Sequence, residues 1–182
     1  RTRNSIIADL KNVCFYYGQM PVLENIDFSI RQNDFLAIIG PNGGGKTTLL
    51  KIMLGLLKPD SGTVKIFGSD PEEGRKSIGY LPQYTHFDPN FPISVFDVVI
   101  MGRYKGMLKK YSPDDRKSAS DALKTVEMFK YRSRHISMLS TGQLQRVLIA
   151  RAMVKEPELL LLDEPMASLD PEMQISIYEL LL

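Results

Sequence analysis

The chain has 182 residues, 43% of them hydrophobic and 24% charged, which is ordinary for one globular core with a small attached subdomain. Its formal net charge of +2 is too small to indicate a nucleic-acid or anionic-lipid partner. The single cysteine, Cys14, excludes an internal disulfide and favours a reducing, cytosolic setting, and apolar runs such as residues 159–162 are far too short to span a membrane.

Strand patterns dominate the first third of the chain. Residues 13–17 are mostly apolar and end at Gly18, and residues 26–30 and 63–68 alternate apolar and polar side chains, as half-exposed strands do. Residues 35–39 are continuously apolar, which predicts a buried parallel strand. This strand is expected to run into Gly40, and a helix is expected to begin near Lys46.

Helical spacing replaces this pattern from about residue 87. A helix is predicted around a set of apolar residues at that spacing: Ala119, Ala122, Leu123, Val126 and Phe129. Another helix is expected after Ser140, and it leads into an apolar strand at residues 159–162. Strands that alternate with helices around a buried sheet predict an α/β fold with inserts.

The strongest single motif lies at residues 40–47, Gly-Pro-Asn-Gly-Gly-Gly-Lys-Thr, which fits the phosphate-loop pattern between a strand and a helix. Glycines let successive backbone N–H groups surround the oxygens of a triphosphate, and the helix that follows points the positive end of its dipole at them. Lys46 can then reach the β- and γ-phosphates, and the Thr47 hydroxyl can bind Mg²⁺. The motif therefore predicts nucleotide binding.

Two acids, Asp163 and Glu164, end the apolar strand 159–162. Because side chains alternate along a strand, the two carboxylates are expected to point in different directions and to do different work. Asp163 is placed to hold Mg²⁺, directly or through water, and Glu164 to polarise the attacking water as a general base. The alternative is an acid that merely caps the next helix, and the phosphate loop favours the catalytic interpretation.

Residues 139–143, Leu-Ser-Thr-Gly-Gln, resemble the signature sequence Leu-Ser-Gly-Gly-Gln of the ABC family, with Thr141 in place of its first glycine. Ser140 and Gln143 also have the spacing of a capping box, so a capped helix without a ligand is the alternative interpretation. Residues 80–83 resemble the Q-loop of that family, and residues 168–170 resemble its D-loop, with Asp170 also suited to an N-cap. Tyr17, or less plainly Tyr16, resembles the aromatic residue that stacks on adenine, although either tyrosine also suits a core.

The resemblance covers nearly the whole chain and implies an α/β fold with a P-loop NTPase core, a mostly parallel sheet, an N-terminal antiparallel β subdomain and an inserted α-helical subdomain. The implied division is a first half of the ATP-binding core with the β subdomain at 1–85, the helical subdomain at 86–138, and an incomplete second half at 139–182. The implied cofactors are ATP and Mg²⁺. The implied catalytic residues are Glu164 and Gln83, and the implied Mg²⁺ ligands are Thr47, Gln83 and Asp163. The implied nucleotide contacts are Tyr17, Gly40, Pro41, Asn42, Gly43, Gly44, Gly45, Lys46, Thr47, Thr48, Ser140, Gly142 and Gln143.

The resemblance also implies partners and a location. Two such domains pair head to tail, and they drive membrane-spanning permease subunits, with a solute-binding protein involved indirectly and no nucleic acid. The chain would then lie at the cytoplasmic face of the cell membrane, attached through the permease. Residues 87–95 and 98–104 look like the zinc and manganese importer branch; iron-chelate and cobalamin importers are close relatives. Phe87 and Phe91 suit either a contact with the permease or a core.

Rival classes fit the sequence less well. A non-transport ABC-type ATPase of DNA or chromosomes would carry a long coiled coil between Gln83 and Ser140, and that interval is too short. A GTPase would carry an Asn-Lys-x-Asp motif for guanine, which is not found here. A regulatory domain that binds ATP without hydrolysing it remains an alternative.

The family's switch histidine is expected beyond Leu182, because His86 and His135 both precede Glu164. These two histidines are expected to be surface or helix-end residues. The sequence thus predicts a C-terminally truncated ATPase that binds ATP, hydrolyses it poorly and rarely dimerises.

Overall fold

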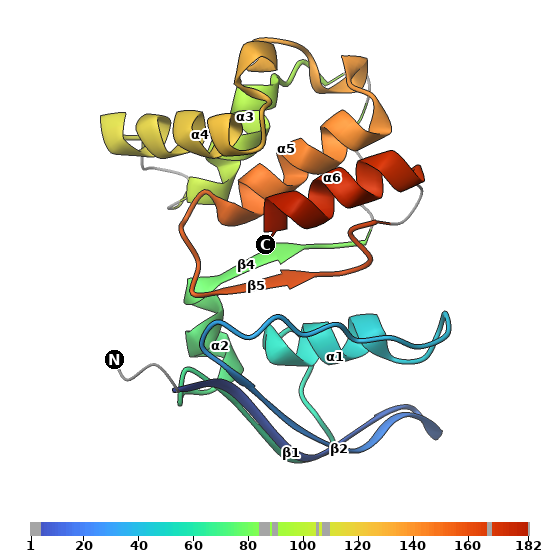
Figure 1. Cartoon of the computed structure of the whole chain (residues 1–182). Coiled ribbons are helices and arrows are strands. Elements are labelled where there is room, and N and C mark those ends of the chain that lie inside the picture. Colours follow the sequence, from blue (N-terminus) through green and yellow to red (C-terminus); the bar gives the residue numbers. More distant parts are fainter. Residues whose placement is uncertain are drawn as a thin grey trace. The chain divides into compact units, whose positions relative to one another are not determined.

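The computed structural model describes residues 5–83, 88, 91–104, 106, 110–166 and 169–181 (Figure 1). The chain divides into two compact units, residues 1–78 and 79–182, and each is described by itself. Four residues named from the sequence, His86, Phe87, Ser168 and Leu182, lie outside the described residues.

Unit 1 is built on an antiparallel sheet with strand order β2-β1-β3. The strands are β1 (Ile6–Tyr17), β2 (Met20–Arg31) and β3 (Ser61–Ile66), and they contain the predicted segments 13–17, 26–30 and most of 63–68. Tyr17 pairs with Met20, so β1 and β2 are joined by a two-residue turn, and Gly18 takes the positive φ (62°) that such a turn favours. The predicted N-terminal antiparallel β structure is confirmed.

Helix α1 (Lys46–Met53) begins at the predicted residue and contacts β3 with its buried face. That face consists of Thr48, Leu49, Leu50, Ile52 and Met53, and this apolar surface explains why so short a helix is stable on the sheet. A second short helix, α2 (Pro71–Gly74), also contacts β3 and continues into the 3₁₀ turn η1 (Arg75–Ser77).

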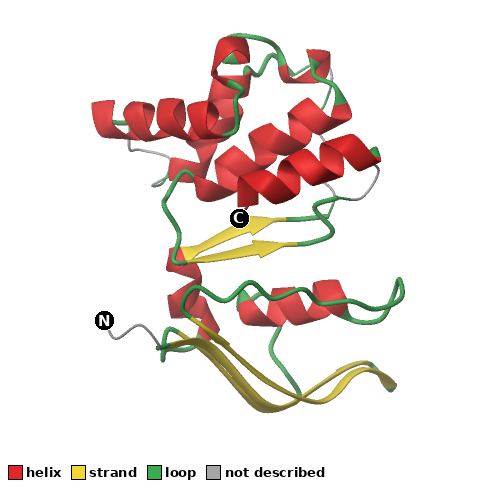
Figure 2. Ribbon diagram, viewed as in Figure 1, coloured by secondary structure: helices red, strands yellow, loops and turns green. Residues whose placement is uncertain are grey.

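The buried strand expected at residues 35–39 is wrong for this structure. These residues form an irregular segment between β2 and the phosphate loop, and Phe35 and Ile39 are 60% and 93% exposed. A strand requires a hydrogen-bonded neighbour, and the described strands of unit 1 pair only with one another. Apolar composition by itself therefore predicted the wrong local structure here (Figure 2).

Unit 2 combines a two-stranded sheet with helices. Strands β4 (Ile78–Leu81) and β5 (Leu159–Leu162) pair with each other, and their arrows point the same way in Figure 1. The helices are α3 (Val95–Ile100), α4 (Pro113–Thr125), α5 (Thr141–Met153) and α6 (Pro171–Leu181). Three further 3₁₀ turns are η2 (Met101–Arg103), η3 (Phe129–Tyr131) and η4 (Ile136–Met138). Parallel strands with covering helices confirm the predicted α/β class.

One apolar core joins α3, α4 and α5. Ala119, Leu123 and Val126 are fully buried in it, and Ala122 and Phe129 pack against it half-buried. The predicted helix is confirmed up to Thr125, whereas Val126 is its C-cap and Phe129 lies in η3. Each of these three helices begins with a capping box, whose N-cap residues are Ser94, Ser112 and Ser140. The three-part division at residues 85 and 138 stays a prediction.

Candidate functional site

The phosphate loop occupies residues 40–45 and ends where α1 begins. Gly43 and Gly45 have φ values of 79° and 82°, in the left-handed region that glycine adopts at little cost. The first turn of α1 leaves its backbone N–H groups without intrahelical acceptors, so they point towards this loop as an anion-binding end. These glycine conformations fit the predicted loop, and its contact with nucleotide stays a prediction.

Lys46 closes this loop on itself. Its Nζ donates hydrogen bonds to the carbonyl oxygens of Gly40 and Pro41, both at 3.0 Å, and the Gly44 N–H donates to the Pro41 oxygen at 3.1 Å. The ammonium group is therefore held over the loop by main-chain atoms. Thr47, the predicted Mg²⁺ ligand, is half-buried in the first turn of α1, whereas Thr48 is buried.

Gly45 is needed for packing as well as for its backbone angle. A Cβ atom at this position would lie 2.9 Å from the Val22 carbonyl oxygen and 2.9 Å from a methyl group of Leu23. Any larger residue would push the loop away from strand β2, which supports it.

The predicted catalytic residues of unit 2 lie together at the ends of β4 and β5. Gln83 follows β4, and its Nε2 donates a hydrogen bond to Glu164 Oε2 at 2.6 Å. The Asp163 N–H donates to the Leu81 carbonyl oxygen at 2.9 Å, which extends the pairing of the two strands up to the acids. Glu164 has a φ of 50°, and this left-handed backbone turns its side chain away from the line of the strand. The structure thus brings Gln83 and Glu164 into direct contact.

Asp163 is the group that fits a bound cation. It is 2% exposed, and its Oδ2 has no hydrogen-bond partner among the residues that the structure describes. A buried carboxylate oxygen without a partner is costly, and an oxygen-seeking ion such as Mg²⁺ would satisfy it. Within the described ranges, no three His, Cys, Asp or Glu side chains form a metal-binding group.

Tyr80 lies on β4 near this acid. Burial first, and then the negative charge of Asp163, raise the pKa of its phenol above the usual range. The hydroxyl therefore stays neutral at physiological pH.

The signature residues begin α5 as a capped helix. The Gln143 N–H donates to Ser140 Oγ at 3.3 Å, and the Ser140 N–H donates to Gln143 Oε1 at 3.2 Å. Gly142 is buried against the Met173 side chain of α6, and α5 and α6 run side by side in Figure 1. The predicted capping box is confirmed. The nucleotide contact of this turn stays a prediction.

Gln145, one turn into the same helix, has a contact that the sequence did not predict. Its Nε2 donates to the carbonyl oxygen of Pro165, directly after Glu164, at 2.7 Å. The two residues are 20 positions apart, so only the fold brings them together. In the sequence, the position of Gln145 directly after the signature was the one feature that could have drawn attention to it.

The remaining candidates from the sequence are two tyrosines and a histidine, and the structure shows ordinary local contacts for each. Tyr17 is 54% exposed and contacts the Phe15 ring edge-on at 5.0 Å between centroids, while the Tyr16 N–H donates to Asp60. Stacking of Tyr17 on adenine stays a prediction. His135 begins η4 as its N-cap, as expected of a helix-end residue, and its Nε2 lies 2.8 Å from the Phe91 carbonyl oxygen.

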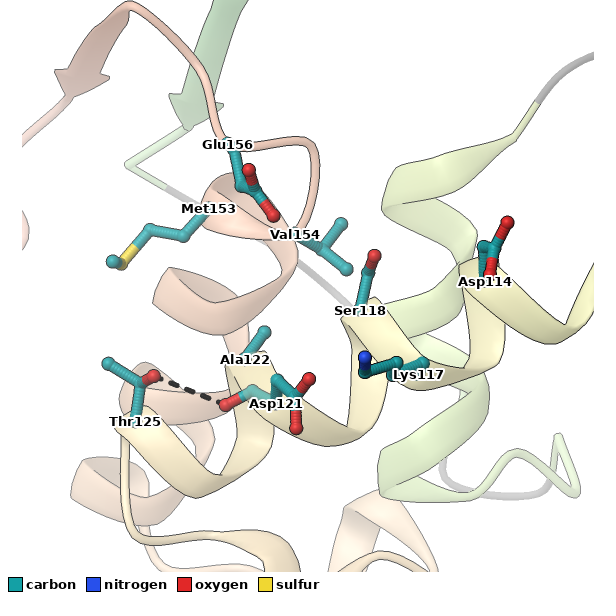
Figure 3. Close-up of a pocket in the computed structure, with 9 residues that line it drawn as sticks. All are labelled: Asp114, Lys117, Ser118, Asp121, Ala122, Thr125, Met153, Val154 and Glu156. Carbon is teal, nitrogen blue, oxygen red and sulfur yellow. Dashed lines mark hydrogen bonds between the residues drawn. The ribbon is translucent and has the colours of Figure 1, made fainter.

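A groove of about 400 Å³ lies elsewhere in unit 2, between α4 and the end of α5 (Figure 3). Asp114, Lys117 and Asp121 line it from α4, and Glu156 lines it from beyond α5. Thr125 Oγ1 donates to the Asp121 carbonyl oxygen at 3.1 Å along its edge. Ala122 of the predicted helix also lines the groove, but none of the predicted catalytic, nucleotide-binding or Mg²⁺-binding residues does.

Over the described residues, no helix is both long and apolar enough to cross a membrane.

Comparison with known proteins gives consistent matches. Residues 23–167 match the family described as ABC transporter. The chain is 43% identical over 176 residues to the manganese transport system ATP-binding protein MntB of Bacillus subtilis (strain 168), covering 96% of this chain and 70% of that protein. It is 42% identical over 176 residues to the high-affinity zinc uptake system ATP-binding protein ZnuC of the same strain, covering 95% and 76%. An ATP-binding cassette solved as a dimer in a post-hydrolysis state, bound to ADP and Pi, is 31% identical, with a TM-score of 0.78 over 96% of this chain and 81% of that chain.

Proposed function

Because this chain belongs to the ABC transporter family, we propose that it is the ATP-binding subunit of a membrane importer for metal ions of the zinc and manganese type. The observation that carries the ATP-binding role is the phosphate loop, in which Lys46 is held over the loop by Gly40 and Pro41. The identity to the manganese and zinc transport proteins supports the choice of cargo. Iron-chelate and cobalamin importers are the second candidates.

Hydrolysis is assigned to the cluster at the ends of β4 and β5. Glu164 orients and polarises the attacking water, and Gln83, which donates to Glu164 Oε2 at 2.6 Å, fixes the direction of that carboxylate. Lys46 and the backbone N–H groups of the loop stabilise charge that develops on the phosphate oxygens. Asp163, Thr47 and Gln83 would hold Mg²⁺, which would supply positive charge against the triphosphate.

The proposed assembly is a head-to-tail pair of copies bound to permease subunits at the cytoplasmic face of the membrane. In that pair, the capped first turn of α5, with Ser140, Gly142 and Gln143, contacts the ATP held by the phosphate loop of the other copy. A solute-binding protein delivers the cargo from outside. The post-hydrolysis dimer of a related cassette supports the pairing of copies.

Replacing Lys46 with methionine tests the nucleotide site. The ammonium makes charge-assisted hydrogen bonds with phosphate, each of which contributes about 1.5–3 kcal/mol, so ATP affinity is expected to fall roughly 10- to 100-fold. The measurement is the binding of a fluorescent ATP analogue. Lys51→Met, the same change at the last turn of α1, is the matched control and should bind normally. Equal affinity in the Lys46 variant would remove the phosphate loop from the proposal.

Replacing Asp163 with asparagine tests the cation site. Because Asp163 Oδ2 has no other hydrogen-bond partner, loss of its charge is expected to weaken divalent-cation binding by about tenfold or more. Electron paramagnetic resonance of Mn²⁺ bound with ADP measures this directly. Asp121→Asn, at an exposed position on α4, is the control. Unchanged Mn²⁺ affinity in the Asp163 variant would show that the buried carboxylate serves only the fold.

The cargo is tested in the assembled transporter by uptake of radioactive zinc, manganese, ferric chelate and cobalamin. Uptake of zinc or manganese that depends on Lys46 supports the proposal. Uptake of the chelate or cobalamin alone would favour the second candidates.

A further inference from the structure

We propose that Gln145 is a positioning residue for ATP hydrolysis: it connects the signature turn of α5 to the turn that holds Glu164. The proposal rests on the proposed function, since it assumes that Glu164 acts in hydrolysis and that Ser140 contacts the nucleotide of a second copy. In such a pair, Ser140 of each chain contacts the nucleotide bound by its partner copy. Gln145 would then couple that contact to Glu164 of its own chain, which acts at the second nucleotide site. The connection consists of the first turn of one helix and one hydrogen bond.

The backbone at Glu164 needs support. Its φ of 50° is uncommon for a residue with a side chain, and the proline that follows normally pushes the preceding residue towards extended conformations. A conformation of this kind persists only where the surroundings hold it. The direction of the Glu164 carboxylate therefore depends on what fixes the peptide group after it.

Pro165 offers one hydrogen-bonding group for that purpose. It lacks an N–H, so its carbonyl oxygen is the only backbone group through which the residue can be held. Gln145 Nε2 donates to that oxygen at 2.7 Å from a half-buried position. This bond fixes the main chain one residue after Glu164, while Gln83 fixes the carboxylate itself.

Other contacts hold the later part of the same loop. Gln174 Nε2, from α6, donates to the Leu169 carbonyl oxygen at 3.0 Å, and the Met173 N–H donates to Asp170 Oδ1 at 2.9 Å. Gln174 Nε2 also lies 3.5 Å from the Met166 carbonyl oxygen, two residues beyond Glu164, but its shorter bond goes to Leu169, five residues beyond. Gln174 therefore supplies a matched comparison: a glutamine on a neighbouring helix that holds the same loop, but mainly at Leu169 rather than at Pro165.

The other end of the connection is the signature turn. Ser140 and Gln143 cap α5 through reciprocal hydrogen bonds, so the first turn is fixed to the rest of the helix. Gln145 lies in the next turn of that helix. A displacement of Ser140 by a phosphate of the second copy would therefore move Gln145, and with it the Pro165 carbonyl group.

The test compares four variants of the intact protein. Gln145→Met removes the donor at similar size, and Gln145→Glu places an acceptor against the Pro165 oxygen. Both are expected to lower kcat, by about fivefold for methionine and more for glutamate, with KM for ATP and cooperativity measured in parallel. KM should stay within about twofold, and the Hill coefficient should fall towards one. Gln145→Lys, which keeps a donor, should recover most of the rate, and Gln174→Met should change kcat by less than twofold.

The outcomes separate this inference from the proposed function. Normal kcat in both Gln145→Met and Gln145→Glu, or equal losses in Gln145→Met and Gln174→Met, would overturn the inference. A failure of Gln145→Lys to recover activity while Gln145→Met is inactive would also overturn it, since packing rather than donation would then matter. An unchanged protein that neither binds nor hydrolyses ATP would instead refute the proposed function.

Discussion

Replacing Glu164 with glutamine is expected to lower the rate of ATP hydrolysis by about 100-fold or more, with ATP affinity unchanged within about twofold. The amide cannot accept a proton from water, which removes the general base. The local structure should survive, because a glutamine oxygen can still accept the hydrogen bond from Gln83 Nε2. Glutamine can adopt the left-handed backbone conformation of residue 164 as readily as glutamate can.

Phosphate release measures the rate, and equilibrium binding of ATP measures affinity. Glu179→Gln, on the exposed face of α6, is the matched control and should hydrolyse ATP normally. Hydrolysis at the unmodified rate in the Glu164 variant would remove this residue from the mechanism. Loss of both binding and hydrolysis would mean that Glu164 supports the fold of the turn instead.

Replacing Arg103 with methionine is expected to destabilise unit 2 by about 3 kcal/mol, because it removes the arginine that pairs with a buried carboxylate. Asp115 is completely buried, and Arg103 Nε donates to its Oδ1 at 2.8 Å. The same carboxylate accepts bonds from the N–H and hydroxyl of Ser112, which begins α4. Those bonds remain in the variant, which places the loss at the lower end of the range for broken buried pairs.

Urea unfolding, followed by circular dichroism, measures this loss. Arg116→Met, one residue after Asp115 and exposed, should change stability by less than about 0.5 kcal/mol. Combining Arg103→Met with Asp115→Asn should recover part of the loss, since the buried negative charge is then removed while the Ser112 contact can persist. A stability equal to the unmodified protein in Arg103→Met would show that solvent reaches Asp115 without that arginine.

Local patterns predicted the elements whose signals are local. The start of α1 at Lys46 and the Ser140–Gln143 capping box each depend on residues within one turn, and both are confirmed. Strand β5 was also predictable, because its apolar run is bounded by a proline and two acids. The family resemblance is likewise confirmed by the match over residues 23–167.

Contacts between distant residues were not predictable from the sequence. Two such contacts are Gln145 with Pro165 and Arg103 with Asp115. They form only after the helices and strands have packed, and no periodicity in the sequence indicates either pair. Residues 35–39 show the opposite failure: a strong local strand pattern without a described strand beside it. The nucleotide roles of Tyr17 and the signature turn remain predictions, because they depend on a ligand and a second copy.

The two hydrogen bonds of Lys46 within its own loop have a thermodynamic consequence. A free lysine side chain loses considerable rotamer entropy when it is immobilised, and a ligand that orders it must offset that loss. Here the backbone has already restrained the ammonium group before any triphosphate arrives. Preorganisation of this kind lets more of the attraction between lysine and phosphate emerge as net affinity.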